Sequence, residues 1–161
     1  MAELAATLLT AAKARGVTIA TAESCTGGMV SAAITDIAGS SAIFDRGFVV
    51  YTNAAKTAQL GVLPETLNAY GAVSEQVAGE MAKGAIRNSD AGLAVSITGI
   101  AGPGGSEHKP EGRVCFGIAT KDDVRTETVE FGALGRAHVR RAARDHALAI
   151  LLDRTLAFSP I

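Results

Sequence analysis

Three side chains that can act as nucleophiles stand next to one another in residues 21–28, whose sequence is TAESCTGG. They are Ser24, Cys25 and Thr26. The segment follows a short run of β-branched residues and precedes an apolar pattern with helical spacing. A chain that turns from a strand into a helix directs backbone N–H groups into the turn, where they can bind an anion. Residues 21–28 therefore predict a nucleophile beside an anion-binding turn, and we expect Glu23 to brace that turn.

A serine hydroxyl needs a base before it can act as a nucleophile at neutral pH. His138 and His146 fall in a segment with amphipathic helical spacing, which is typical of surface or packing residues. His108 lies in a glycine-rich stretch that folding can bring close to Ser24. Among the histidines, His108 is therefore the candidate base.

Lys56 is a better candidate base than the histidines, because it lies in a helix expected directly after the strand 44–51. The carboxyl ends of parallel strands share one edge of a sheet, where ligands bind. Ser24, Tyr51 and Thr98 all stand at such ends. A lysine that is desolvated there can lose its charge and accept the serine proton, and a tyrosine hydroxyl can relay it. The spacing favours a Ser–Lys pair, with a solvated Lys56 as the alternative.

Cys25 is the rival nucleophile, because a thiol is more reactive than a hydroxyl and a helix N-terminus would lower its pKa. The alternative is that Cys25 is a small buried apolar residue. The only other cysteine is Cys115, and a single pair of this kind does not predict a disulfide. We expect both thiols to be reduced, as in a cytoplasmic protein.

Two glycine-rich segments, 21–28 and 98–106, are candidate cradles for a phosphate or a carboxylate, although neither ends as a Walker loop does. Arg136, Arg140 and Arg144 recur every four residues, which is usually a solvated helix face. The alternative is functional: one or two of these arginines, or the adjacent Arg141, bind a phosphate bidentately. We expect the following residues to contact a substrate: Thr26, Gly27, Gly28, Thr98, Gly99, Gly102, Arg140 and Arg141.

Composition predicts a single α/β domain over residues 1–161, because 48% of the chain is hydrophobic and small residues, including 18 glycines, are abundant. The formal net charge of −1 predicts no general attraction to nucleic acid or to a membrane. No window is a signal peptide or reaches the roughly 18 apolar residues of a membrane span, so we expect a cytoplasmic protein. The histidines and cysteines lack metal-ligand spacing, which predicts neither a metal nor another cofactor.

Periodicity and turn residues predict an alternating order of helices and strands. The expected helices are 2–15, 26–38, 53–61, 64–70, 75–87 and 136–156, and the expected strands are 17–22, 44–51, 93–97, 114–120 and 124–131. We expect Asn53 and Ser74 to be N-caps and Gly16 to end the first helix. This order predicts a three-layer α/β/α sandwich around a central mixed β-sheet.

Several ordered motifs resemble the CinA C-terminal domain family. They are residues 21–28, GAVS at 71–74, GIAGP at 99–103, and the stretch 34–41 followed by Tyr51 and Lys56. The similarity covers nearly the whole chain. One departure is the turn before the last helix, where many members carry Gly-Asp-Arg and this chain has Leu134-Gly135-Arg136.

This resemblance implies hydrolysis of nicotinamide mononucleotide to nicotinate mononucleotide and ammonia, by a serine mechanism without a metal. Carried over by position, it places the nucleophile on Ser24 and the assisting pair on Tyr51 and Lys56. We expect the phosphate to lie on glycine-rich backbone and on Arg140 or Arg141, and the oxyanion on N–H groups around 26–27.

Two other classes of function stay open at this point. One is a module that binds a pyridine nucleotide without turnover, and the other is an interaction protein linked to competence or DNA damage. We expect a homo-oligomer, because small α/β enzymes are often dimers or larger.

Overall fold

Five strands form one mixed sheet in the computed structural model, which describes residues 1–106 and 108–159. The strands lie in the order β2-β1-β3-β4-β5, with β1 parallel to both of its neighbours and the remaining pairs antiparallel. Their bounds are Ile19–Glu23 (β1), Phe44–Val49 (β2), Leu93–Gly99 (β3), Arg113–Ala119 (β4) and Val124–Glu130 (β5). Glu23 pairs with Val49 on one side and Ile97 on the other, so β1, β2 and β3 reach the same edge of the sheet.

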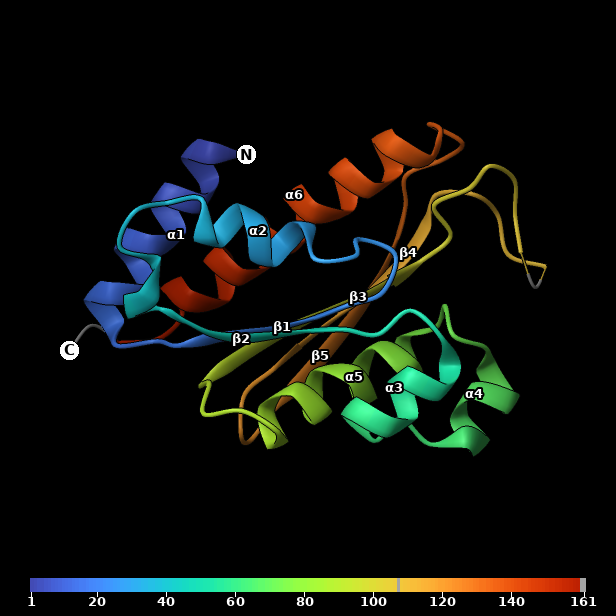
Figure 1. Ribbon diagram of the computed structural model, residues 1–161, viewed down its shortest axis with the longest axis horizontal. Helices are drawn as coiled ribbons and strands as arrows, with labels where there is room; N and C mark the ends of the chain where they lie inside the picture. Colours follow the sequence, from blue (N-terminus) through green and yellow to red (C-terminus); the bar gives the residue numbers. More distant parts are fainter. Residues whose placement is uncertain (107, 160–161) are drawn as a thin grey trace.

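Helices cover both faces of this sheet (Figure 1). One layer holds α1 (Ala2–Arg15), α2 (Met29–Thr35) and α6 (Arg136–Leu156), and the other holds α3 (Asn53–Leu60), α4 (Pro64–Tyr70) and α5 (Glu75–Arg87). A short 3-10 helix, Ser40–Ala42, precedes β2. The predicted three-layer α/β/α sandwich with a mixed sheet is therefore confirmed.

Each helical layer buries its own apolar cluster against the sheet. The larger cluster lies beneath α1, α2 and α6 and includes Leu8, Phe116 and Leu148. The smaller one, beneath α3, α4 and α5, includes Met81. At Gly84 of α5 a Cβ atom would collide with the Leu60 carbonyl at the end of α3, so glycine there allows the two helices to approach closely.

The helix limits follow the predictions to within one residue except for α2, which spans Met29–Thr35 where the sequence predicts 26–38. Helix α2 begins at Met29 rather than at residue 26, because Gly27 and Gly28 adopt positive φ angles of 57° and 106° that interrupt a right-handed helix. Thr52, not Asn53, caps α3, and its hydroxyl accepts a hydrogen bond from the Ala55 N–H at 3.1 Å. The strand before it ends at Val49, two residues earlier than predicted.

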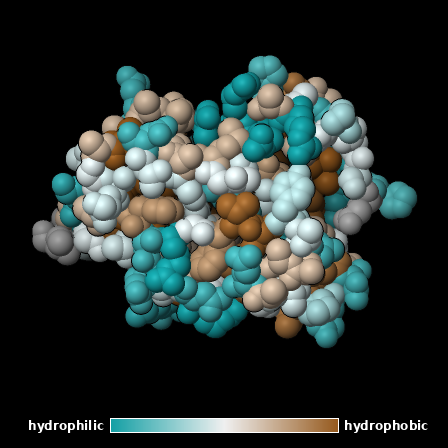
Figure 2. All heavy atoms as spheres, viewed as in Figure 1, coloured by the Kyte–Doolittle hydropathy of each residue, from teal (hydrophilic) through white to brown (hydrophobic). Residues whose placement is uncertain are grey.

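Apolar and hydrophilic side chains are interspersed on the face shown in Figure 2. Among the residues that the structure describes, no helix combines the length and the apolar character that crossing a bilayer requires.

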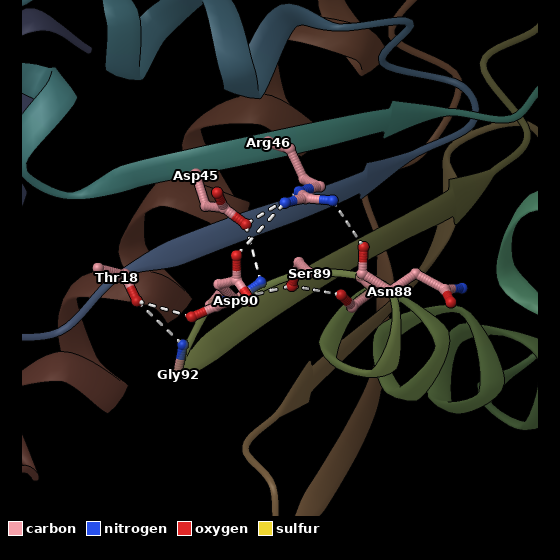
Figure 3. Close-up of polar contacts among 9 residues, drawn as sticks. Thr18, Asp45, Arg46, Asn88, Ser89, Asp90 and Gly92 are labelled. Atoms are coloured by element: carbon pink, nitrogen blue, oxygen red, sulfur yellow. Dashed lines mark hydrogen bonds and ion pairs between the residues drawn. The ribbon is translucent and has the colours of Figure 1, made fainter.

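A polar cluster at the amino end of the sheet ties β2 to the loop before β3 (Figure 3). Asp45 Oδ2 accepts hydrogen bonds from the Asp90 N–H and from Arg46 Nε, each at 3.0 Å. The hydrogen bond from Asp90, followed by the Arg46 guanidinium, holds the pKa of Asp45 below its usual range despite partial burial. The charged carboxylate therefore stabilises the fold.

Asp45→Asn should lower the midpoint of urea unfolding at pH 7, because the amide keeps the shape of the carboxylate but loses its charge. A folded-state pKa below the unfolded value of about 3.9 gives stability that is present above that pH and is lost as the pH falls through the folded value. The difference between variant and wild type should therefore shrink below about pH 4. A difference that stayed constant from pH 7 to pH 3 would contradict this interpretation.

Candidate active site

A buried hydrogen bond joins Ser24 to Lys56 at the carboxyl edge of the parallel strands. Lys56 Nζ lies 3.1 Å from Ser24 Oγ and donates to the Tyr51 carbonyl oxygen at 3.0 Å. Ser24 is 8% exposed and Lys56 is 1% exposed. Burial disfavours the charged form of an amine, and a neutral amine at this distance can accept the hydroxyl proton. The arrangement can therefore activate Ser24 as a nucleophile.

The fold explains how a lysine comes to be buried here. The Val50 N–H donates to the Glu23 carbonyl at 2.9 Å, which keeps the chain beside β1 just past the end of β2. Helix α3 then begins immediately, and its inward face carries Lys56 and Leu60, four residues apart. Lys56 thus occupies an inward-facing helix position that would ordinarily hold an apolar side chain. Its amine is directed at Ser24, the residue that follows β1.

Glu23 caps the amino end of α2 from inside the protein. Its fully buried carboxylate accepts hydrogen bonds from the N–H groups of Gly28 (3.2 Å), Val30 (2.9 Å) and Ser31 (3.0 Å), and from the Ser31 hydroxyl (2.9 Å). The prediction that Glu23 braces the turn is confirmed. The N–H of Gly28, which the sequence predicts to contact substrate, donates to Glu23 in this structure.

Arg140 holds the same turn from α6. Its Nε donates to the Cys25 carbonyl at 3.0 Å and its Nη2 to the Thr26 carbonyl at 3.3 Å. A Cβ atom on Gly27 would lie 3.3 Å from Arg140 Nη2, so the glycine also leaves room for the guanidinium. Arg140 is therefore bonded to the backbone of the nucleophile turn, which differs from the expected role as a phosphate-binding arm.

A pocket of about 300 Å³ opens beside this turn. Its lining consists of Cys25, Tyr51, Arg136 and the glycine-rich residues 99–106. Arg136 Nη1 donates to the Gly102 carbonyl at 2.8 Å, and Nη2 donates to the Tyr51 hydroxyl at 2.7 Å. Gly99 and Gly102, which the sequence predicts to contact substrate, both line this pocket. The arginine at the pocket is Arg136 rather than Arg141, which is exposed on α6 and does not line it.

The CinA C-terminal domain matches residues 1–155 of this chain. The chain belongs to that family. This CinA domain is 54% identical over 147 residues to a protein of Escherichia coli (strain K12) named nicotinamide-nucleotide amidohydrolase PncC, covering 91% of this chain and 89% of that protein.

Two further similarities are to a longer protein and to a chain of nearly the same length. It is 56% identical over 124 residues to a CinA-like protein of Chlorobium phaeobacteroides (strain BS1), covering 74% of this chain but only 30% of that protein. The crystal structure of the competence/damage inducible protein CihA from Agrobacterium tumefaciens superposes with a TM-score of 0.91 at 47% identity, covering 94% of this chain and 93% of that one. The domain thus matches both a stand-alone chain and part of a larger protein.

The hydrogen bond between Lys56 and Tyr51 is made to the backbone carbonyl of Tyr51. Its side chain is 58% exposed, and its hydroxyl accepts the hydrogen bond from Arg136. The Tyr51 hydroxyl is thus bonded to Arg136, whereas the sequence predicted a role as a proton relay. The hydrogen bond to the Ser24 hydroxyl comes from Lys56 itself.

Two threonines of the predicted site have different surroundings. The Thr98 hydroxyl is buried and donates to the Ala72 carbonyl at 2.8 Å, so it holds the segment before α5 and is not directed at a ligand. Thr26 is fully buried, and its Oγ1 has no hydrogen-bond partner among the described residues. Of these two threonines, Thr26 is therefore the one whose hydroxyl has no hydrogen-bond partner in the described part of the chain, and it lies two residues after Ser24.

His146 has partners away from Ser24. Its ring lies against Phe116 in a tilted arrangement with ring centroids 4.6 Å apart, and it contacts Glu127 Oε1 at 2.6 Å. His108 is exposed, and in the described part of the chain the side chain bonded to the Ser24 hydroxyl is Lys56. Within that part, no group of three or more His, Cys, Asp and Glu residues could hold a metal ion.

Cys25 should resist alkylation in the folded protein. Burial raises the pKa of its thiol to about 12, overcoming the opposing effects of its own backbone N–H and of Arg140. The expectation that a helix N-terminus lowers this pKa is therefore wrong. Relative to the ordinary value, the fraction of thiolate at pH 8 falls roughly 10³-fold, and Cys25 is only 5% exposed.

The measurement is peptide-resolved iodoacetamide labelling at pH 8, with unfolded protein in urea as the control. Labelling of Cys25 should be at least about 100-fold slower in the folded state. Equal rates in the two states would show that the thiol is accessible and ionised.

Proposed function

We propose that this CinA domain hydrolyses the carboxamide of nicotinamide mononucleotide, giving nicotinate mononucleotide and ammonia. The observation that carries the proposal is the buried 3.1 Å hydrogen bond between Ser24 and Lys56 beside a glycine-rich pocket with an arginine. A relative named for this activity, identical at 54% of aligned positions, supports the choice of substrate.

In the first half of the reaction Lys56, as the neutral amine, takes the Ser24 proton while Oγ attacks the carboxamide carbon. The carbonyl oxygen becomes an oxyanion, and the N–H of Thr26 is the proposed donor to it, worth about 3–4 kcal/mol in comparable sites. The C–N bond then breaks, and Lys56 returns the proton to the departing nitrogen. The products of this half are ammonia and an ester of Ser24.

In the second half a water molecule attacks the ester carbonyl, with Lys56 accepting its proton. The ester bond to Ser24 Oγ breaks, and the proton passes from Lys56 to that oxygen. Nicotinate mononucleotide leaves and the hydroxyl is restored. The sum is amide plus water giving acid plus ammonia, with no cofactor required.

Arg136 is the residue that we propose for the phosphate of the substrate. It lines the pocket, and its guanidinium carries the bidentate geometry that suits phosphate oxygens. Its bonds to the Gly102 carbonyl and the Tyr51 hydroxyl hold it in place without neutralising its charge. This assignment replaces Arg140 and Arg141, and it gives Tyr51 the role of positioning Arg136.

The deciding experiment measures ammonia release from nicotinamide mononucleotide, nicotinamide riboside, free nicotinamide and the dinucleotide, side by side. The proposal expects turnover of the mononucleotide and a lower kcat/KM for the substrates that lack the phosphate. Thermal stabilisation by the mononucleotide without ammonia release would instead indicate a binding module. Absence of both would favour an interaction protein. We also propose a cytoplasmic homo-oligomer that binds no nucleic acid.

A further inference from the structure

Glu111 connects two parts of the pocket that are distant in sequence. It lies in the loop before β4, and its Oε1 accepts a hydrogen bond from the Gly104 N–H at 2.7 Å. Its Oε2 accepts one from the Gly135 N–H at 2.9 Å. Hydrogen bonds from N–H groups to a carboxylate are stronger than those between neutral groups. The side chain therefore clamps the glycine-rich loop to the residue that precedes α6.

The backbone of Glu111 is itself held against β3. The Gly112 N–H donates to the Ile100 carbonyl at 2.8 Å, and the Ile100 N–H donates to the Arg113 carbonyl at 2.9 Å. These bonds continue the antiparallel ladder of β3 and β4 beyond the strand ends. Glu111 therefore directly precedes a backbone segment that is hydrogen-bonded to the end of β3, and its carboxylate connects this segment to the loop and to α6.

Gly102 shows how closely the loop packs on this carboxylate. A Cβ atom at Gly102 would lie 2.5 Å from Glu111 Cδ, and the residue has a φ of 91°. The carbonyl of the same residue accepts the hydrogen bond from Arg136. Gly135, the second partner of Glu111, is the N-cap of α6 and directly precedes Arg136. One carboxylate therefore holds both the glycine-rich loop and the residue before Arg136, and Arg136 is itself hydrogen-bonded to that loop.

We propose that Glu111 is a positioning residue that places Arg136 and the glycine-rich loop for binding the phosphate of the substrate. This inference rests on the proposed function for the identity of the ligand. Glu111 forms no ion pair with Arg136 among the described residues, so the connection runs through the backbone at Gly102, Gly104 and Gly135. The charge of Glu111 is directed at N–H groups and does not cancel that of Arg136.

The kinetic test compares Glu111→Ala with a matched control, Glu130→Ala, which removes a half-exposed carboxylate paired with Arg113. In Glu111→Ala the KM for nicotinamide mononucleotide should rise roughly 10-fold while kcat stays within about 3-fold of wild type. For nicotinamide riboside, which lacks the phosphate, kcat/KM should be the same in variant and wild type. Glu130→Ala should leave all of these values unchanged.

Glu111→Gln keeps the length of the side chain and one acceptor oxygen but sets an amide N–H against one backbone N–H. Its KM should fall between those of wild type and Glu111→Ala, and it tests the proposal even if the alanine variant does not fold. A KM for the mononucleotide equal to that of wild type in both variants would overturn the proposal. A rise in KM for nicotinamide riboside equal to that for the mononucleotide would overturn it as well.

Amide hydrogen exchange and calorimetry separate this inference from the proposed function. In Glu111→Ala the amides of Gly104 and Gly135 should exchange at least about 10-fold faster, whereas that of Ile97 in β3 should not change. If wild type released no ammonia from any amide, the proposed function would fail. The clamp would still be tested by whether nicotinamide mononucleotide binds roughly 10-fold more weakly to the variant in a calorimeter. Unchanged exchange and unchanged binding would overturn it.

Discussion

Replacement of Ser24 by alanine should reduce ammonia release from nicotinamide mononucleotide by about 10³-fold or more, as removal of the nucleophile does in other serine hydrolases. The Ser24 hydroxyl is hydrogen-bonded to the buried amine of Lys56, at 3.1 Å. The reaction loses its covalent step when that oxygen is removed. Binding of the substrate should change little, because the pocket is lined by other residues.

The measurement is a coupled ammonia assay on wild type and Ser24→Ala, with a dissociation constant from calorimetry for each. Cys25→Ala is the matched control, because it changes the adjacent residue and removes a single buried sulfur atom. Its activity should stay within about 5-fold of wild type, since the protonated thiol is not a competent nucleophile. If Ser24→Ala kept full activity while Cys25→Ala lost it, the nucleophile would be the thiol.

Sequence patterns predicted the fold well where local signals and tertiary packing agree. The limits of α1, α4, α5 and α6 follow from helical periodicity and from end signals such as the Ser74 cap, whose Oγ accepts the Val77 N–H at 3.2 Å. The start of α2 was misplaced because its apolar spacing continues into residues 26–28. There the buried Glu23 carboxylate takes the first N–H groups and the glycines turn the chain.

Within the candidate site, the sequence predicted which residues lie together at the strand ends. It did not predict which side chains and backbone groups form hydrogen bonds there. Ser24 and Lys56 were expected together, because parallel strands end at one edge of the sheet. Arg140 and Arg136 lie one helical turn apart on the same face, so periodicity alone does not tell which one reaches the pocket. Glu111 was missed because its partners Gly104 and Gly135 lie 7 and 24 residues away. The glycine density of residues 99–105 was the only sequence signal that a side chain packs closely there.

Lys56→Met should abolish turnover to a similar extent, with a loss of about 10³-fold in kcat, while leaving the protein folded. Methionine fills the same elongated space at this 1% exposed position but offers no lone pair that can take the Ser24 proton. Removal of the amine leaves the Tyr51 carbonyl without that donor, at a cost of about 1–3 kcal/mol, so the thermal midpoint should fall by several degrees while the unfolding transition stays cooperative. The measurements are kcat from the ammonia assay and the midpoint from calorimetry.

The pH dependence distinguishes a base from a residue that only supports the structure. A general base must be deprotonated to act, so kcat/KM of the wild type should rise with pH as Lys56 loses its proton. The residual activity of Lys56→Met should lack that rise. Lys56→Arg should be equally inactive although it keeps the positive charge, because a guanidinium stays protonated throughout the accessible range. Activity of Lys56→Arg close to that of wild type would mean that the charge matters and the proton transfer does not. A wild-type profile that levelled off near the ordinary histidine pKa of about 6.5 would assign the base to an imidazole instead.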